Sequence, residues 1–220
     1  MIVAVIAGKG GVGKSTVALN LAAELDGVVV DADLSMADLP PGSGPDLHDV
    51  LAGRATPLEA VTDAGSVRIL PCGRSLAGAR AADPTTLGTA LDAVASQYGR
   101  VVVDCPAGLS SDAGLPLLAA DACVLVTRPT EAALAAAMRA RELARAVETP
   151  LARVVLNRAQ SMEPEPIAAA LGAPVVRLPE STSLARAQHH GRPVGVVAPD
   201  CPASDRFAEL AAAVHSAIRS

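Results

Sequence analysis

The chain of 220 residues is nearly devoid of aromatic side chains: it contains one Phe, one Tyr and no Trp. Proteins that bind single-stranded nucleic acid by stacking bases on aromatic platforms need several such side chains, so the composition disfavours that mode. An excess of positive charge is also missing, because the net charge is −5 and the pI is about 5.3. No global field therefore attracts DNA or an anionic membrane, and nonspecific DNA binding is disfavoured.

Long apolar runs and paired cysteines are absent from the sequence as well. No run approaches the ~20 residues of a membrane-spanning helix, and the first expected strand starts at Ile2, which leaves no room for a signal peptide. The cysteines at 72, 105, 123 and 201 form no Cys-x-x-Cys pair, which argues against a zinc clip or an iron–sulfur carrier. We expect a cytoplasmic protein with reduced thiols; an unusual cluster ligated across a dimer is the alternative.

Lysine is the last scarce residue, and its placement is informative. Of 18 basic residues only Lys9 and Lys14 are lysines. Lysine presents a compact point charge that fits inside a ring of backbone amides, whereas arginine presents a planar fork. The ligand that fits such a ring is a phosphate, so the sequence predicts nucleotide binding.

Both lysines lie in one motif that follows the apolar run at residues 2–6. Its spacing, Gly-x4-Gly-Lys-Ser, is that of a P-loop, whose amides and following helix N-terminus cradle phosphates. We expect Lys14 to reach the β- and γ-phosphates, Ser15 to ligate Mg²⁺ and Thr16 to touch the α-phosphate of ATP. The nucleotide-binding residues predicted here are Gly8, Lys9, Gly10, Gly11, Val12, Gly13, Lys14, Ser15 and Thr16.

Strand-like runs of Val, Ile and Leu alternate with helical patterns along the whole chain. This alternation predicts an α/β fold: a doubly wound, mainly parallel sheet of about seven or eight strands with helices on both faces, in a single domain over 1–220. The expected strands are 2–7, 28–31, 67–70, 101–104, 123–127, 154–157 and 175–178. The expected helices are 15–25, 46–53, 84–98, 112–120, 130–147, 164–171, 180–190 and 204–219.

The motif at 8–16 resembles the deviant Walker A box of the MinD/ParA family of ATPases, most closely the MinD-like branch. The early lysine at position 9 carries this resemblance. In that family it crosses a dimer interface and contacts the partner's nucleotide, as an arginine finger supplied in trans does. The resemblance therefore implies that Lys9 and Lys14 act in catalysis and that Lys9 couples hydrolysis to dimerisation.

Two carboxylates, Asp31 and Asp33, end the second expected strand and point to the same side, toward the phosphate loop. The segment resembles switch I of MinD-like proteins, with Ser35 and Asp38 as departures. The resemblance implies that Asp33 orients or deprotonates the attacking water and that Asp31 holds a water of the Mg²⁺ shell. The run at 101–108 resembles Walker B and switch II and brings the catalytic Asp104 next to Mg²⁺. The predicted metal-binding residues are Ser15, Asp31 and Asp104.

Adenine contacts are expected where later strands end. Asn157 ends the sixth expected strand and Arg158 follows it; an amide can both donate to and accept from an adenine edge, as the Asn-Arg motif of the family that this chain resembles does. Leu178, Pro179 and Glu180 follow the seventh and resemble the family's second adenine-flanking loop. A segment at 46–53 resembles a short MinD-like helix, and His48 within it is expected to be structural.

These motifs favour an ATPase switch that forms a homodimer around ATP and Mg²⁺ and positions or partitions a cargo through an activating or cargo protein. Autonomous membrane binding is not expected, because the last helix has an apolar stripe typical of core packing (Phe207, Leu210, Val214 and Ile218) and no polybasic cluster. The alternatives are an ATP-dependent small-molecule ligase on the same scaffold, a ParA-type DNA-segregation ATPase using Arg139, Arg141 and Arg145, and an electron-transfer ATPase.

Overall fold

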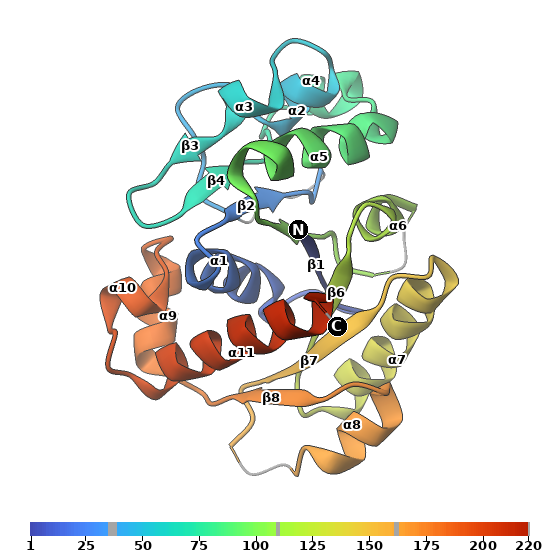
Figure 1. Cartoon of the computed structure of the whole chain (residues 1–220), viewed down its shortest axis with the longest axis vertical. Helices are drawn as coiled ribbons and strands as arrows, with labels where there is room; N and C mark the ends of the chain where they lie inside the picture. The colour runs from blue at the N-terminus through green and yellow to red at the C-terminus, as the bar shows by residue number, and fades with distance from the viewer. Residues whose placement is uncertain (35–38, 109–110, 161–162, 220) are drawn as a thin grey trace.

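The computed structural model describes residues 1–34, 39–108, 111–160 and 163–219. Within these ranges lies one sheet of eight strands in the order β3-β4-β2-β5-β1-β6-β7-β8 (Figure 1). Each described pair of neighbours is parallel apart from β3 and β4, which are antiparallel. The strands are β1 (Ile2–Ile6), β2 (Val28–Asp31), β3 (Thr62–Asp63), β4 (Arg68–Leu70), β5 (Val101–Asp104), β6 (Ala122–Thr127), β7 (Leu151–Asn157) and β8 (Val175–Leu178).

Helices cover both faces of this sheet. One face packs against α1 (Lys14–Glu24), α9 (Thr182–His189), α10 (Val194–Val197) and α11 (Pro202–Arg219). The other packs mainly against α2 (Leu47–Leu51), α3 (Pro57–Ala60), α5 (Leu87–Tyr98), α6 (Ser111–Leu118), α7 (Glu131–Ala146) and α8 (Glu165–Leu171). The remaining elements are α4 (Leu76–Ala81) and a single 3-10 turn, η1 (Pro84–Thr86).

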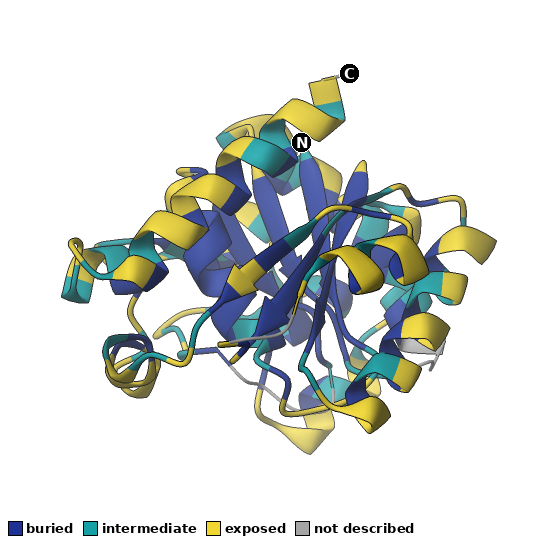
Figure 2. Cartoon of the chain, turned by 90° about the horizontal axis from the view of Figure 1, so that it is seen from below, coloured by how far each residue is buried: buried dark blue, intermediate teal, exposed yellow. Residues whose placement is uncertain are grey.

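The central strands are buried on both faces, as Figure 2 shows by their uniform dark blue. In β5, Val102 packs toward the α1 side, whereas Val101 and Val103 pack toward the α5 side. A strand enclosed on both faces needs apolar side chains at every position, which explains the unbroken valine runs. The first charged residue of β5 is Asp104 at its carboxyl end, where parallel strands of such sheets present ligand-binding groups.

This architecture confirms the predicted doubly wound sheet, with several corrections to its elements. The expected helix at 180–190 begins only at Thr182, because the Ser181 hydroxyl accepts a hydrogen bond from the Leu184 amide (3.2 Å) and caps the helix there. β7 starts three residues before the expected Val154. The short elements α3, α4, α10 and β3 were not expected. In α11, Phe207, Leu210 and Val214 are fully buried against α1 and the sheet, as core packing requires.

None of the described helices is long and apolar enough to cross a membrane.

Candidate functional site

The loop between β1 and α1 has the backbone of a phosphate cradle. Gly11 has φ +74° and Gly13 has φ +101°, values that glycine adopts without a Cβ clash. A Cβ on Gly10 or Gly11 would meet nothing within 4 Å, so this side of the loop is open. α1 then starts at Lys14, which directs the positive end of the helix dipole toward the same opening.

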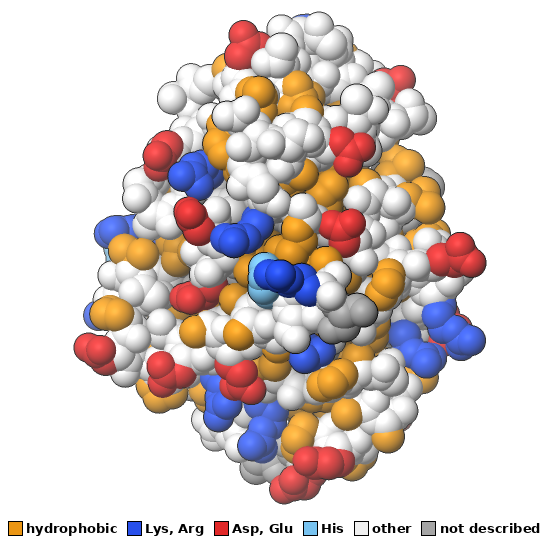
Figure 3. Space-filling view, in the orientation of Figure 1, with side chains coloured by type: hydrophobic (Ala, Val, Ile, Leu, Met, Phe, Trp, Pro, Cys, Tyr) orange, Lys and Arg blue, Asp and Glu red, His pale blue; other side chains and the backbone are white. Residues whose placement is uncertain are grey.

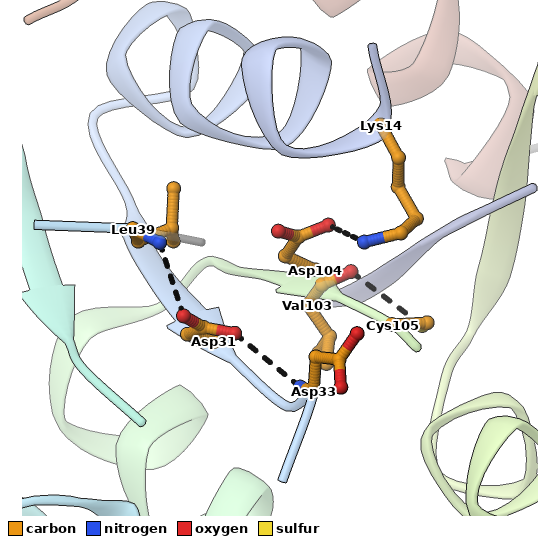
Figure 4. A network of polar contacts seen from close by, with 7 residues as sticks. All are labelled: Lys14, Asp31, Asp33, Leu39, Val103, Asp104 and Cys105. Carbon is orange, nitrogen blue, oxygen red and sulfur yellow. Dashed lines mark hydrogen bonds and ion pairs between the residues drawn. The ribbon is translucent and has the colours of Figure 1, made fainter. Parts of the chain in front are cut away.

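The two lysines of this loop occupy opposite environments. The Lys14 ammonium points from the first turn of α1 to the end of β5, where Nζ lies 2.5 Å from Oδ1 of Asp104 (Figure 4). Lys14 is 7% exposed and Asp104 is fully buried, so this ion pair is formed away from solvent. Lys9, in contrast, is exposed at the rim of the loop.

Asp31 and Asp33 lie together at the end of β2 and have different surroundings. The Asp31 carboxylate is fully buried and accepts two backbone hydrogen bonds, from the amide of Asp33 (3.3 Å) and from the amide of Leu39 (3.1 Å) (Figure 4). Asp31 is also the register partner of Asp104 in the β2–β5 pair, which brings the two acidic strand ends side by side. Ser35 and Asp38 lie outside the described residues.

The end of β7 contacts the phosphate loop directly. The Nδ2 group of Asn157 donates to the carbonyl oxygen of Val12 at 2.7 Å, and this side chain is buried. The next residue, Arg158, has φ +56° and is exposed. The Asn157 amide, which the sequence predicted as an adenine contact, is therefore bonded to the phosphate loop in this conformation.

One cavity of about 770 Å³ brings most of the predicted residues together. A cavity of this size accommodates a nucleotide, since ligand pockets span roughly 300–1,000 Å³. The predicted residues that line it are Lys9, Gly10, Gly11, Gly13, Lys14, Ser15, Thr16, Asp33, Asn157, Arg158, Pro179 and Glu180.

Five predicted residues lie behind this lining. Asp31 and Asp104 are fully buried at the strand ends, and Leu178 is fully buried in the core. Val12 is 4% exposed and presents its carbonyl to Asn157. Gly8 packs on α7, because a Cβ at this position would lie only 1.9 Å from the carbonyl oxygen of Ala136.

The cavity also contains residues that were not predicted from the sequence. Leu34 follows Asp33, and Pro106 and Ala107 follow β5; the others belong to the start and first turns of α9: Ser181, Leu184, Ala185 and Gln188. The signal for α9 was available, since Ser181 is a good helix N-cap directly after the Pro179–Glu180 loop. A helix that starts at the cavity edge presents its first turns to the ligand.

The described donor groups fit ATP with Mg²⁺. Mg²⁺ is held in proteins by one or two carboxylates and hydroxyl oxygens together with the phosphates of the substrate. Ser15 lines the cavity, and Asp31 and Asp104 lie behind this lining at neighbouring strand ends. Among the described residues no three His, Cys, Asp or Glu side chains converge as a metal site by themselves.

Cys105, directly after Asp104, is fully buried, and its thiol lies 3.6 Å from the Val103 carbonyl oxygen (Figure 4). Burial raises the pKa of this thiol. Full burial is the environment of a side chain that fills space in the core.

Comparisons with known proteins agree with this geometry. Residues 3–194 match the model of the CobQ/CobB/MinD/ParA nucleotide binding domain. An uncharacterized ATP-binding protein of Methanocaldococcus jannaschii is 30% identical over 226 residues, which covers 96% of this chain and 86% of that protein.

Two archaeal structures are similar over almost their whole length. The cell division ATPase MinD of Pyrococcus furiosus superimposes with a TM-score of 0.91 at 28% identity, covering 98% of both chains. The septum site-determining protein MinD of Pyrococcus horikoshii, in complex with Mg-ADP, gives a TM-score of 0.88 at 29% identity, covering 96% of this chain and 93% of that chain. The chain described here belongs to the MinD/ParA family of nucleotide-binding P-loop ATPases.

Proposed function

We propose that this protein is an ATP-hydrolysing switch that dimerises around two ATP·Mg²⁺ and positions a cellular cargo through a partner protein. The observation that carries the proposal is the contrast between its two lysines. Lys14 is buried beside Asp104 at the bottom of the cavity, whereas Lys9 is exposed at its rim. A cation at the rim is placed to reach the nucleotide of a second protomer.

In this proposal, each charged group of the cavity has a separate role in ATP binding or hydrolysis. Lys14 exchanges its contact with Asp104 for the β- and γ-phosphates, and the loop amides at 10–16 hold the remaining phosphate oxygens. Asp33 lines the cavity and orients the attacking water, or accepts its proton, while the bond between the γ-phosphorus and its bridging oxygen breaks. Ser15, Asp31 and Asp104 would hold Mg²⁺ directly or through water, and the ion would neutralise developing phosphate charge.

The adenine lies, in this proposal, between Asn157 and Arg158 on one side and the Leu178–Glu180 segment on the other. Arg158, Pro179 and Glu180 line the cavity together with residues of α9. Backbone groups of the loop before α9 hold the base edge there, since Leu178 itself is buried in the core.

The surface favours a protein partner over nucleic acid. Basic and acidic side chains are interspersed on the face shown in Figure 3. On α7, Arg141 pairs with Glu142 at 2.7 Å, and Arg145 lies 3.9 Å from the same carboxylate. The arginines that the sequence offered as a DNA-binding patch are therefore partly neutralised.

The test is the molar mass measured by light scattering with Mg²⁺ and ATP, on an Asp33→Ala variant that retains ATP. We expect ATP to double the mass, and an added Lys9→Ala substitution to abolish the doubling. ADP is the control that leaves the mass at one protomer. A mass that stays at one protomer with ATP, while wild type releases phosphate from ATP, would contradict the lysine-bridged dimer and favour a small-molecule ligase.

A further inference from the structure

His48 is a buried polar side chain that the proposed chemistry does not use. It lies on α2 and is 2% exposed. Its Nε2 is 3.1 Å from the carbonyl oxygen of Leu34, which lines the nucleotide cavity directly after Asp33. Because a carbonyl oxygen only accepts hydrogen bonds, this contact requires the ring proton to be on Nε2.

The His48 ring is held from several sides. Cys72 Sγ lies 3.5 Å from Nε2, and burial raises the pKa of this thiol to about 12, so it stays a neutral neighbour. The backbone of Gly73 lies against the other ring nitrogen: a Cβ at this position would be 2.3 Å from Nδ1. Nδ1 itself has no hydrogen-bond partner within the described part of the chain. Gly73 is thus packed closely against the Nδ1 side of the ring.

The helix that carries His48 is itself fixed. Asp46 and Asp49 form a reciprocal capping box, in which the Asp49 amide donates to Asp46 Oδ1 at 3.1 Å. The Leu47 amide donates to the Pro71 carbonyl at 2.9 Å, and the Leu47 side chain is fully buried. α2 is thereby attached to the exit of β4, so the imidazole extends from a rigid base.

Several backbone amides of the segment that His48 contacts are also hydrogen-bonded. Asp31 accepts from the amides of Asp33 and Leu39, and the Leu34 amide donates to Ala32 at 3.1 Å. His48 adds the contact that joins the Leu34 carbonyl to a different part of the fold. The backbone is thus held on both sides of Asp33, at its own amide by Asp31 and at the carbonyl of the following residue, Leu34, by His48.

We propose that His48 is a positioning residue that fixes the Leu34 backbone and, through it, the carboxylate of Asp33 at the edge of the nucleotide cavity. The proposal rests on the role proposed above for Asp33. His48 acts on the placement of one carboxylate, so it influences the hydrolysis step. None of its described contacts is with the phosphate loop, so it leaves the conformation of that loop unchanged.

Two amide substitutions form a matched pair for the test. The terminal nitrogen of Gln occupies a place similar to Nε2 and can donate to Leu34, whereas the shorter Asn reaches only as far as Nδ1. In His48→Asn we expect amide exchange at Asp33 and Leu34, measured by NMR, to accelerate on the order of 5-fold or more. The kcat for ATP should fall by a similar factor with KM nearly unchanged, and His48→Gln should restore both values.

The outcomes separate this proposal from the proposed function. Equal exchange at Asp33 and Leu34 in the Asn and Gln variants overturns the role of His48, and so does a KM that rises while kcat is kept. Exchange does not depend on hydrolysis, so it still decides the question if wild type proves not to hydrolyse ATP. The ¹⁵N spectrum of wild-type His48 is independent of any variant's folding: a proton on Nε2 supports the proposal, and a proton on Nδ1 overturns it.

Discussion

At the scale of single residues, the two lysines show how one motif places the same side chain in opposite roles. Lys14 and Asp104 form a buried pair 2.5 Å apart, and removing one member leaves the other charge in a poorly solvated place. Lys9 has an exposed side chain in the described protomer. The stability of the isolated chain should therefore depend on Lys14 and should not depend on Lys9.

Lys14→Ala should lower the free energy of unfolding of the nucleotide-free protein by about 3–5 kcal/mol, the usual result of breaking a buried ion pair. Lys9→Ala, the matched control from the same loop, should change it by less than about 0.5 kcal/mol. Urea unfolding followed by circular dichroism measures both. Equal destabilisation by the two substitutions would show that the Lys14–Asp104 pair contributes no particular stability.

At the scale of elements, the first glycine of the phosphate loop is a packing residue. Gly8 lies so close to the Ala136 carbonyl of α7 that a Cβ would lie 1.9 Å from that oxygen, and backbone cannot move aside as a flexible side chain can. Gly10, two residues later, has open space on the corresponding side. The loop thus has one glycine that serves its contact with α7 and another that faces the cavity.

Gly8→Ala should separate the loop from α7 and destabilise the nucleotide-free protein by about 1–3 kcal/mol, the usual cost of overpacking. Gly10→Ala should leave the stability within about 0.5 kcal/mol, because nothing occupies the space of its Cβ. Thermal unfolding without nucleotide compares the two variants. If both variants melt with the wild type, the close approach of Gly8 to α7 is not a constraint on the fold.

The spacing of apolar residues along the sequence predicted the long helices and strands of this fold, but it did not predict the short ones. The valine runs of β5 and β2 and the amphipathic pattern of α5 and α11 are long enough to be distinct. α3 has four residues and β3 has two, too few for any period. A local signal did exist for α3: Thr56, Pro57 and Glu59 form a capping box with proline in the first turn.

The same division applies to the site. The P-loop spacing predicted the residues that line the cavity between β1 and α1, because it is a local motif of nine residues. The contact between Asn157 and Val12 joins positions 145 residues apart, and His48 on α2 contacts Leu34 in the turn after β2. Contacts of this kind depend on how elements pack, so neither spacing nor composition could predict them.

At the scale of the whole molecule, buried thiols link stability to alkaline pH. Burial raises the pKa of Cys72 and of Cys123 from 9.0 to about 12, and it also raises the pKa of Cys105. Above pH 9 the unfolded chain loses these protons while the folded chain keeps them. Folded pKa values above the unfolded ones mean that stability is complete below pH 9 and is lost as the pH rises toward 12.

Each of these thiols should lower the free energy of unfolding by up to about 1.4 kcal/mol per pH unit above pH 9. Few other groups titrate there, since the chain has two lysines and one tyrosine. Urea unfolding at pH 8, 9 and 10 measures the slope. Replacing all three buried cysteines by alanine should flatten it, and Cys201→Ser, at a partly exposed position, should not. If the triple replacement leaves the slope unchanged, the loss of stability at alkaline pH must come from other titrating groups.

The contact between Asn157 and the phosphate loop also has an evolutionary consequence. Nδ2 of Asn157 lies 2.2 Å from the place where a Cβ on Gly13 would stand, and the same group holds the Val12 carbonyl at 2.7 Å. A mutation at either position alone therefore meets a clash or gives up the bond. We therefore expect substitutions at these two distant positions to be linked, with Gly13 tolerating a side chain only where Asn157 has been replaced and only as far as its backbone angle permits.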